Sequence, residues 1–219
     1  MRKIISVDQG SDAWFQERSG KPTASAFHKL IKSDGKERTT NPKEHQSYLW
    51  RLVVERILGR PADDPQNYKS YFAERGRKLE LKAADWFETK VAAKVANIGL
   101  VLTEDERWGS SPDRLIIGTD EVLEIKCPME WTQARYLAHP EELEDDYWPQ
   151  LQGHMLVGDF QAVHLWSYHP DIPDIYRIIR RDVKFCDQLR RILNKFIKEM
   201  DKEEELARTR WFNQRGEES

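Results

Sequence analysis

The chain has 219 residues, of which 39% are hydrophobic, 33% charged and 11% aromatic. This length and composition predict one globular domain with a core of moderate size, and they argue against a disordered chain, a collagen-like repeat and a membrane-spanning protein. The formal net charge is −3, but residues 1–60 hold 12 Lys or Arg against 7 Asp or Glu, a local excess of +5. Because nucleic-acid binding depends on where charge lies, a basic face on an acidic body is compatible with a DNA partner.

The cysteine count and the absence of long apolar runs indicate in which cellular compartment the protein works. Cys127 and Cys186 are too few for a disulfide framework, and the start of the chain lacks a charged segment followed by an apolar one, so we expect a protein of the reducing cytoplasm. No window approaches the roughly 20 apolar residues of a membrane span, so no membrane partner is expected. We expect the 8 Trp mainly in the core and a subunit interface, with base stacking as an alternative for one or two.

Hydrophobic periodicity predicts a sheet with flanking helices. The predicted helices are 71–91, 131–137, 147–157 and a final long one with a buried stripe at 185–200. The predicted strands are 95–102, 113–117, 122–126, 162–168 and 174–179. The predicted irregular connections are 33–43, 59–67 and 139–146. Within the last of these, an acidic cluster at 141–146 is expected as a solvated loop before a helix, with a partner interface as the alternative.

The stretch most informative for chemistry runs from Gly109 to Pro128, GSSPDRLIIGTDEVLEIKCP. It places Asp113 at the start of one predicted strand and both Glu124 and Lys126 on the next. Residues two apart on a strand point to the same face of a sheet, and a hairpin through 118–120 can bring Asp113 beside them. Two carboxylates and an amine therefore converge. For Glu124 and Lys126 taken alone, a surface cross-strand pair is the alternative.

Carboxylates in this placement suit a divalent cation. Their hard oxygens bind Mg²⁺ or Mn²⁺ and leave positions free for water and a phosphate oxygen. Two such ions about 3.5 to 4 Å apart stabilise the attacking and leaving oxygens of an in-line phosphodiester displacement. Nearby positive charge and partial burial lower the pKa of an amine, so we expect Lys126 to lose its proton readily and to orient or deprotonate the attacking water.

SPD at 111–113 and LEIKCP at 123–128 resemble the active-site signature of the PD-(D/E)XK nuclease superfamily. Three further blocks, in the right order, make the chain more closely similar to lambda exonuclease and the YqaJ-type phage recombinases: SDAWFQERSGKPTAS (11–25), ERGRKLELKAADWFE (74–88) and YWPQLQGHM (147–155). The similarity covers most of the chain and weakens at 33–69 and 139–146. It implies an α/β fold of restriction-endonuclease type, with a mixed central sheet flanked by helices and the site at one sheet edge.

The resemblance also assigns roles to single residues. Asp113 and Glu124 match the metal ligands, Lys126 matches the catalytic lysine, and Glu80 matches an acidic residue that completes the metal and water shell. Gln152 matches a glutamine that helps to position the nucleophile. The residues that match a grip on the 5′ phosphate of the cut strand are Arg18, Ser25 and Ser111.

Structural roles are the alternative for several of these side chains. Without the resemblance, Glu80 belongs to an ordinary charged helix face, and Gln150 and Gln152 cap or solvate a helix. His154 is expected as a packed or surface histidine rather than as a ligand.

The activity implied by the resemblance is Mg²⁺-dependent digestion of one strand of linear double-stranded DNA from its 5′ end. It releases mononucleotides and leaves a 3′ single-stranded tail for recombination, with Mn²⁺ as a substitute cation. The implied assembly is a homotrimeric ring around DNA, and the implied partner is a single-strand annealing recombinase of the same phage or prophage. We divide the single domain, 1–219, into a basic DNA-end-binding part (1–66), a catalytic core (67–182) and a C-terminal helix and tail (183–219).

Two other functions remain open on the sequence. One is an endonuclease or flap nuclease of the same superfamily, because a metal site does not encode polarity. The other is a non-catalytic scaffold that binds DNA ends for recombination. Retention of Asp113, Glu124 and Lys126 together argues against the scaffold, since a disused site has no physical reason to keep three converging charges.

Overall fold

A five-stranded sheet forms the centre of the structure, a computed structural model that describes residues 2–38, 42–62 and 71–215. In sheet order its strands are β2 (Val95–Asn97), β5 (Arg114–Ile116), β6 (Glu121–Lys126), β7 (Ala162–Ser167) and β8 (Ile175–Arg180). β6 and β7 are parallel, and every other neighbouring pair is antiparallel. The sheet is therefore mixed, as the sequence predicts.

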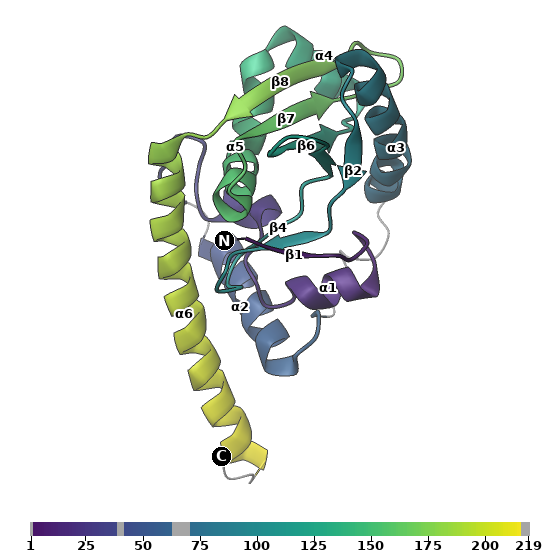
Figure 1. Ribbon diagram of the computed structural model, residues 1–219. Helices are drawn as coiled ribbons and strands as arrows, with labels where there is room; N and C mark the ends of the chain where they lie inside the picture. Colours follow the sequence, from purple (N-terminus) through teal and green to yellow (C-terminus); the bar gives the residue numbers. More distant parts are fainter. Residues whose placement is uncertain (1, 39–41, 63–70, 216–219) are drawn as a thin grey trace.

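Helices cover both faces of this sheet (Figure 1). The helical elements are α1 (Asp12–Arg18), the 3₁₀ helix η1 (Ala24–Lys29), α2 (Pro42–Leu58), α3 (Tyr71–Val91), α4 (Glu130–Ala138), α5 (Pro140–Gly158) and α6 (Val183–Arg215). On one face, Phe87 of α3 meets Trp166 of β7 edge to face, with ring centroids 5.6 Å apart. On the other, Met155 of α5 packs in one cluster with Val163 of β7. The predicted α/β fold with helices on both sides of a mixed sheet is confirmed.

A second, three-stranded sheet lies beside the first. Its order is β1 (Lys3–Ile5), β3 (Leu100–Leu102) and β4 (Gly109–Ser110). The sequence predicts one strand over 95–102, but the structure divides it between the two sheets. Gly99 marks the division, because a Cβ there would overlap the carbonyl oxygen of Ile5. Only a glycine allows the chain to pass this close to the neighbouring backbone.

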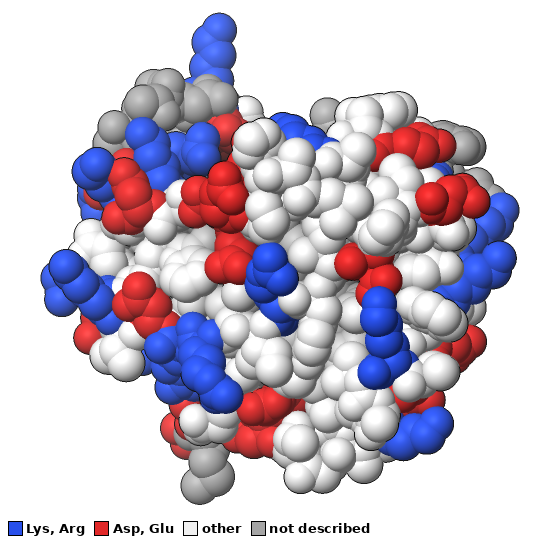
Figure 2. Space-filling model, turned by 90° about the horizontal axis from the view of Figure 1, so that it is seen from above, with Lys and Arg blue, Asp and Glu red and all other residues white. Residues whose placement is uncertain are grey.

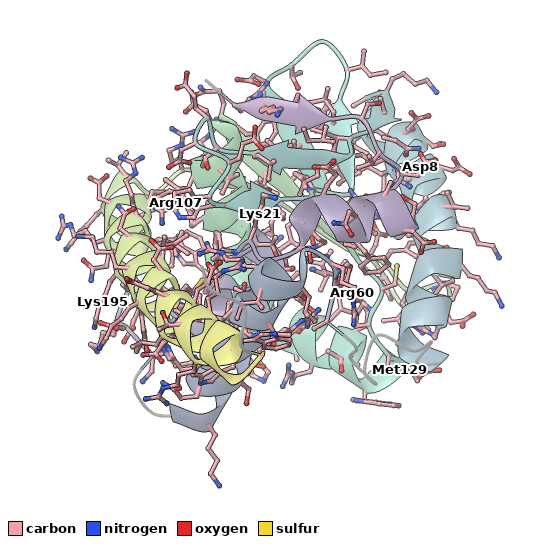
Figure 3. The ribbon with its side chains drawn as sticks, turned by 90° about the horizontal axis from the view of Figure 1, so that it is seen from below. Asp8, Lys21, Arg60, Arg107, Met129 and Lys195 are labelled. Carbon is pink, nitrogen blue, oxygen red and sulfur yellow. The ribbon has the colours of Figure 1, made fainter. Side chains whose placement is uncertain are left out.

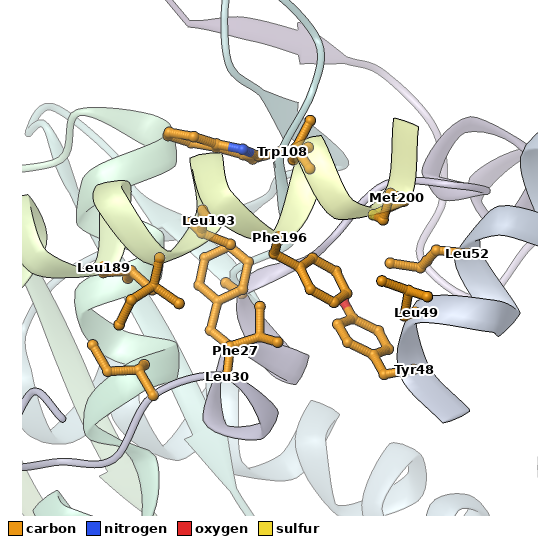
Figure 4. Packing of buried hydrophobic residues seen from close by; sticks show 14 of the residues in the cluster. Phe27, Leu30, Tyr48, Leu49, Leu52, Trp108, Leu189, Leu193, Phe196 and Met200 are labelled. Atoms are coloured by element: carbon orange, nitrogen blue, oxygen red, sulfur yellow. The ribbon is translucent and has the colours of Figure 1, made fainter. Parts of the chain in front are cut away.

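The long helix α6 packs along α2 and η1 (Figure 4). Its predicted buried stripe is confirmed, since Leu189, Leu193, Phe196 and Met200 follow one another at steps of three or four and are buried. Phe196 stacks on Tyr48 of α2, with ring centroids 5.5 Å apart. Beyond this cluster the helix continues past the body of the molecule (Figure 1).

The segment 139–146 is not the solvated loop that the sequence predicts, because α5 begins at Pro140. Proline suits the first turn of a helix, where its missing N–H leaves no bond unmade. Leu143 is fully buried, and Asp146 accepts a hydrogen bond from the hydroxyl of Tyr136 at 2.8 Å. The acidic cluster is therefore the opening of a packed helix.

Sequence periodicity also misses α2. Leu49 and Val53 are buried, whereas Trp50, Val54 and Leu58 are exposed on the opposite side, so apolar residues surround the helix and blur its stripe. α2 begins inside the connection predicted at 33–43, of which 39–41 lie outside the described residues, as do 63–67 of the connection at 59–67. In the described ranges, no helix combines the length and apolar character needed to cross a bilayer.

Candidate active site

The converging charges lie on β6 and just before β5. Nζ of Lys126 is 2.7 Å from Oε1 of Glu124. Oδ2 of Asp113 accepts a hydrogen bond of 2.6 Å from the backbone N–H of Ile125, and the β5–β6 hairpin turns at Gly118 with a φ of 83°. The structure thus brings the three predicted side chains together. It places them on the middle strand of the sheet and not at a sheet edge, because β2, β7 and β8 extend the sheet to either side.

One face of α5 covers these groups. The amide of Gln150 donates to Oε1 of Glu124 at 2.6 Å, and its Oε1 accepts from Nζ of Lys126 at 3.0 Å. Nζ of Lys126 also lies 4.3 Å from the ring centroid of Tyr147. Nε2 of His154 is 3.0 Å from Oε2 of Glu124. Residues 147, 150 and 154 follow the spacing of one helix face, so α5 presents all three side chains to β6.

Gln152 does not reach these groups, contrary to the role that the sequence assigns to it. Its amide donates to the carbonyl oxygen of Arg180 at 3.1 Å, and its Oε1 accepts from the backbone N–H of Asp182 at 2.9 Å. Each residue turns an α-helix by about 100°, so side chains two apart point to nearly opposite sides. The glutamine at the site is therefore Gln150, and Gln152 joins α5 to the end of β8.

Glu80 adjoins the site from the other face of the sheet. It lies on α3, where its Oε1 is 2.7 Å from Nη1 of Arg114. Nη1 of Arg114 also donates to the carbonyl oxygen of Asp113 at 2.6 Å. The charge of Glu80 contributes to raising the pKa of Asp113. Glu80 is thus linked to the site through Arg114, which the sequence analysis does not single out.

The buried charges shift one another's pKa values. Burial, then the charges of Glu124 and Glu80, raises the pKa of Asp113 well above its usual value. For Glu124, burial raises the pKa, but Lys126 and His154 outweigh it and hold the pKa low. Burial lowers the pKa of Lys126, but the neighbouring acids, Glu124 first, raise it more. This direction applies to the site without a bound cation or phosphate, so the ready loss of the proton expected beside them stays a prediction.

The carboxylates of Asp113 and Glu124 fit a divalent cation. Oε2 of Glu124 is buried without a hydrogen-bond donor among the described residues, and burial, followed by the charges of Glu124 and Glu80, raises the pKa of Asp113. Mg²⁺ prefers such oxygens and typically takes only one or two carboxylates with water. No three His, Cys, Asp or Glu side chains in the described ranges form a ready-made metal cluster. Glu80 instead faces Arg114.

The three residues expected at the 5′ phosphate share one neighbourhood. Nη2 of Arg18 donates to Oγ1 of Thr23 at 2.7 Å, and its guanidinium lies 4.1 Å from the ring centroid of Trp14. Nε1 of Trp14 in turn donates to Oγ of Ser111 at 3.0 Å. Ser25 and Arg18 both line a pocket of about 240 Å³. Trp14 thus links Arg18 to Ser111.

This pocket is rich in cations. Among the described residues, its lining includes Arg18, Lys21, Lys29 and Arg51 against the single acid Glu55. Burial lowers the pKa of Arg18, as expected for a desolvated cation. Lys21 lies beside α1 on the lower side of the molecule (Figure 3). The face of the molecule seen from above is not rich in cations like this pocket. Acidic and basic side chains alternate there around a wide uncharged area (Figure 2).

Sequence reasoning missed the site roles of Trp14, Arg114, Gln150 and His154. The blocks that carry the family resemblance include Trp14, Gln150 and His154, so the signal for them was present. The missing step was to place residues 147–154 on a helical wheel, which groups Gln150 with Tyr147 and His154. Arg114 carried no such signal, because its pairing with Glu80 depends on where α3 packs.

A mixed sheet between helical layers, with Glu124 and Lys126 on β6 and Asp113 just before the neighbouring β5, defines a protein of restriction-endonuclease-like fold. The chain belongs to the YqaJ-like viral recombinase domain family, whose model matches residues 13–161. A search among curated proteins finds no match.

Solved structures share this fold. LHK-Exo, an alkaline exonuclease from Laribacter hongkongensis solved in complex with dAMP, is 24% identical with a TM-score of 0.80, covering 93% of this chain and 99% of that chain. Another crystal structure of LHK-Exo, with the same identity and coverage, gives a TM-score of 0.75. A phage-related exonuclease from Haemophilus somnus is 16% identical with a TM-score of 0.62, covering 83% and 94%. At these identities the likeness establishes the fold.

Proposed function

We propose that this protein is a Mg²⁺-dependent 5′-to-3′ exonuclease that degrades one strand of linear double-stranded DNA to mononucleotides. The observation that carries the proposal is the buried contact of Lys126 with Glu124 beside Asp113. Two carboxylates and a lysine, brought together by β6 and the start of the neighbouring β5, suit phosphodiester hydrolysis. Family membership and the exonucleases among the structural relatives support the same substrate and reaction.

In this mechanism each side chain has a separate task. Asp113 and Glu124 would hold the ions, which supply Lewis acidity toward the phosphate and activate water. Lys126, whose Nζ lies 2.7 Å from Oε1 of Glu124, would orient or deprotonate the attacking water. Gln150 holds the lysine side chain in place through the bond between Oε1 and Nζ.

The cationic pocket supplies the 5′ end recognition. Among the described residues, the direct contacts of Arg18 are neutral, the Thr23 hydroxyl and the Trp14 ring, and the acid Glu55 acts on it only through its charge, so the guanidinium can pair with an anion. A guanidinium suits a terminal phosphate because it donates parallel hydrogen bonds. On this basis the pocket binds the 5′ phosphate while the strand is cut at the carboxylates.

The activity is tested by a time course on matched linear and closed circular duplexes, labelled at either end, with Mg²⁺ or with chelator. Immediate release of the 5′ label from linear DNA alone, dependent on Mg²⁺, is expected. Cutting of the circle would indicate an endonuclease or flap nuclease. Tight binding without any cleavage would indicate a recombination scaffold.

The proposed biological setting is phage-type recombination in a bacterial cell. We propose that the 3′ tail left by the reaction is the substrate of a single-strand annealing recombinase. We also propose that the protein forms a homotrimeric ring around DNA, which would account for processive digestion. Both proposals rest on the family resemblance. Mass measurement in solution checks the trimer, and co-purification with a single-strand annealing recombinase of the same phage or prophage checks the partner.

A further inference from the structure

A buried polar chain connects the small sheet to Glu124. Oγ of Ser110, on β4, is 2.7 Å from Nδ1 of His154, on α5. Nε2 of the same imidazole is 3.0 Å from Oε2 of Glu124, on β6. Ser110 is 0% exposed, His154 1% and Glu124 3%, so solvent does not compete for these groups.

The two oxygens of Glu124 have different surroundings. Oε1 accepts hydrogen bonds from Gln150 at 2.6 Å and from Lys126 at 2.7 Å. Oε2 faces the imidazole of His154, at an orientation that falls short of a hydrogen bond, so both atoms are unsatisfied among the described residues. Buried polar atoms are rarely left in this condition. Oε2 is therefore the oxygen of Glu124 that is best placed for a further ligand.

We propose that His154 is a positioning residue that fixes the carboxylate of Glu124 for metal binding, with Ser110 fixing the imidazole. The inference rests on the proposed function, because it takes Glu124 as a metal ligand. A ligating carboxylate is oriented by the polar groups behind it, here the imidazole 3.0 Å from Oε2, and loss of such a group typically weakens metal binding or activity by about 10- to 100-fold. Ser110, His154 and Glu124 come from three separate elements, so they also connect the small sheet to the site.

The test is a calorimetric titration of Mn²⁺ into the full-length protein without DNA. H154F, which keeps a ring but removes both nitrogens, should weaken Mn²⁺ binding by about 10- to 100-fold. S110A keeps the imidazole but removes the hydroxyl that contacts its Nδ1, so we expect a smaller loss of Mn²⁺ affinity. H154Q retains an N–H donor and should recover part of the affinity. The double variant S110A/H154F should lose no more Mn²⁺ affinity than H154F alone, because Ser110 acts on Glu124 only through His154.

His164 provides the matched control. Its Nε2 is 2.6 Å from Oε2 of Glu121, and its Nδ1 is 2.6 Å from the hydroxyl of Tyr176. Like His154, it is buried, with 7% exposure, between a carboxylate and a hydroxyl, but it lies outside the site. H164F should lower the melting temperature yet leave the Mn²⁺ affinity unchanged. A purely structural role for His154 predicts the same result for H154F.

Wild-type Mn²⁺ affinity in folded H154F would overturn the inference. If H154F does not fold, wild-type affinity in S110A overturns it equally. Failure of the proposed function would give a different result from these two outcomes, because the wild-type protein would then neither bind Mn²⁺ nor cleave DNA. If the wild type binds and cleaves and the variants match it, the inference alone fails.

Discussion

The amide of Gln150 donates a hydrogen bond of 2.6 Å to Glu124, and its oxygen accepts one of 3.0 Å from Lys126. A single side chain therefore holds the metal-binding carboxylate and the lysine of the proposed mechanism in register. Q150A should lower kcat by about 10- to 100-fold with little effect on DNA affinity, because it loosens groups that act only during the reaction.

Gln152 is the matched control for that experiment. It is the other glutamine of the same helix, but it bonds to the backbone of Arg180 and Asp182. Q152A should lower the melting temperature, since two buried backbone groups lose their partner, and should leave kcat of the folded protein near the wild-type value. The reverse pattern in single-turnover cleavage and thermal unfolding would restore the assignment of Gln152 made from the sequence.

Arg18 is expected to decide the preference for a phosphorylated 5′ end. R18A should reduce the ratio of cleavage rates on 5′-phosphate and 5′-hydroxyl duplexes by about 10- to 100-fold, because a charge-assisted hydrogen bond to the phosphate is lost. K195A serves as the control, since Lys195 is an exposed cation on α6 that pairs with Glu37. An unchanged ratio in R18A would place phosphate recognition elsewhere.

Because the hydroxyl of Tyr48 is buried, we expect the folded protein to lose stability at alkaline pH. Burial raises the pKa of its hydroxyl to about 12, whereas an unfolded tyrosine titrates near 10. Unfolding then releases a proton above pH 10, so the stabilising contribution, about 2 to 3 kcal/mol, is complete below pH 10 and is lost as the pH rises to 12. Urea unfolding at pH 8 to 11 should show a shallower decline in Y48F than in the wild type. Equal slopes would show that Tyr48 does not titrate in this way.

Gly153 sets how closely α5 approaches η1. A Cβ there would lie 2.6 Å from Cδ2 of Phe27 and 3.1 Å from Cβ of Ala24. G153A should therefore destabilise the protein by about 1 to 3 kcal/mol through overpacking, although alanine is the better helix former. The double variant G153A/F27L, which makes room, should recover part of the loss in a denaturant titration. A stabilised G153A would mean that η1 moves away at little cost.

Local patterns predict the parts of this site that lie on strands. The alternation along β6 and the short hairpin before it place Glu124, Lys126 and Asp113 together, because both depend on adjacent residues. The side chains from α5 depend on helical phase, which selects Gln150, whereas the resemblance to the family assigned this role to Gln152. The pairing of Glu80 with Arg114 depends on how α3 packs across the sheet, which no local pattern contains.

The same distinction explains the errors in the fold. The segment 139–146 looks solvated because it is acidic, but Leu143 and the bond from Tyr136 to Asp146 draw it into a helix. The division of 95–102 between two sheets depends on the approach of β1 to Gly99. These features come from contacts between segments far apart in the chain, so the sequence alone does not predict them.

The most direct measurement is single-turnover cleavage and DNA binding by K126M, alongside the wild type and the control K90M. Lys90 pairs with Asp174 at 2.8 Å outside the site, so its replacement also removes a lysine–carboxylate pair. The account predicts that K126M binds a 5′-phosphorylated linear duplex with wild-type affinity but cleaves it about 100- to 10,000-fold more slowly, while K90M matches the wild type in both. Wild-type cleavage by K126M would contradict the account.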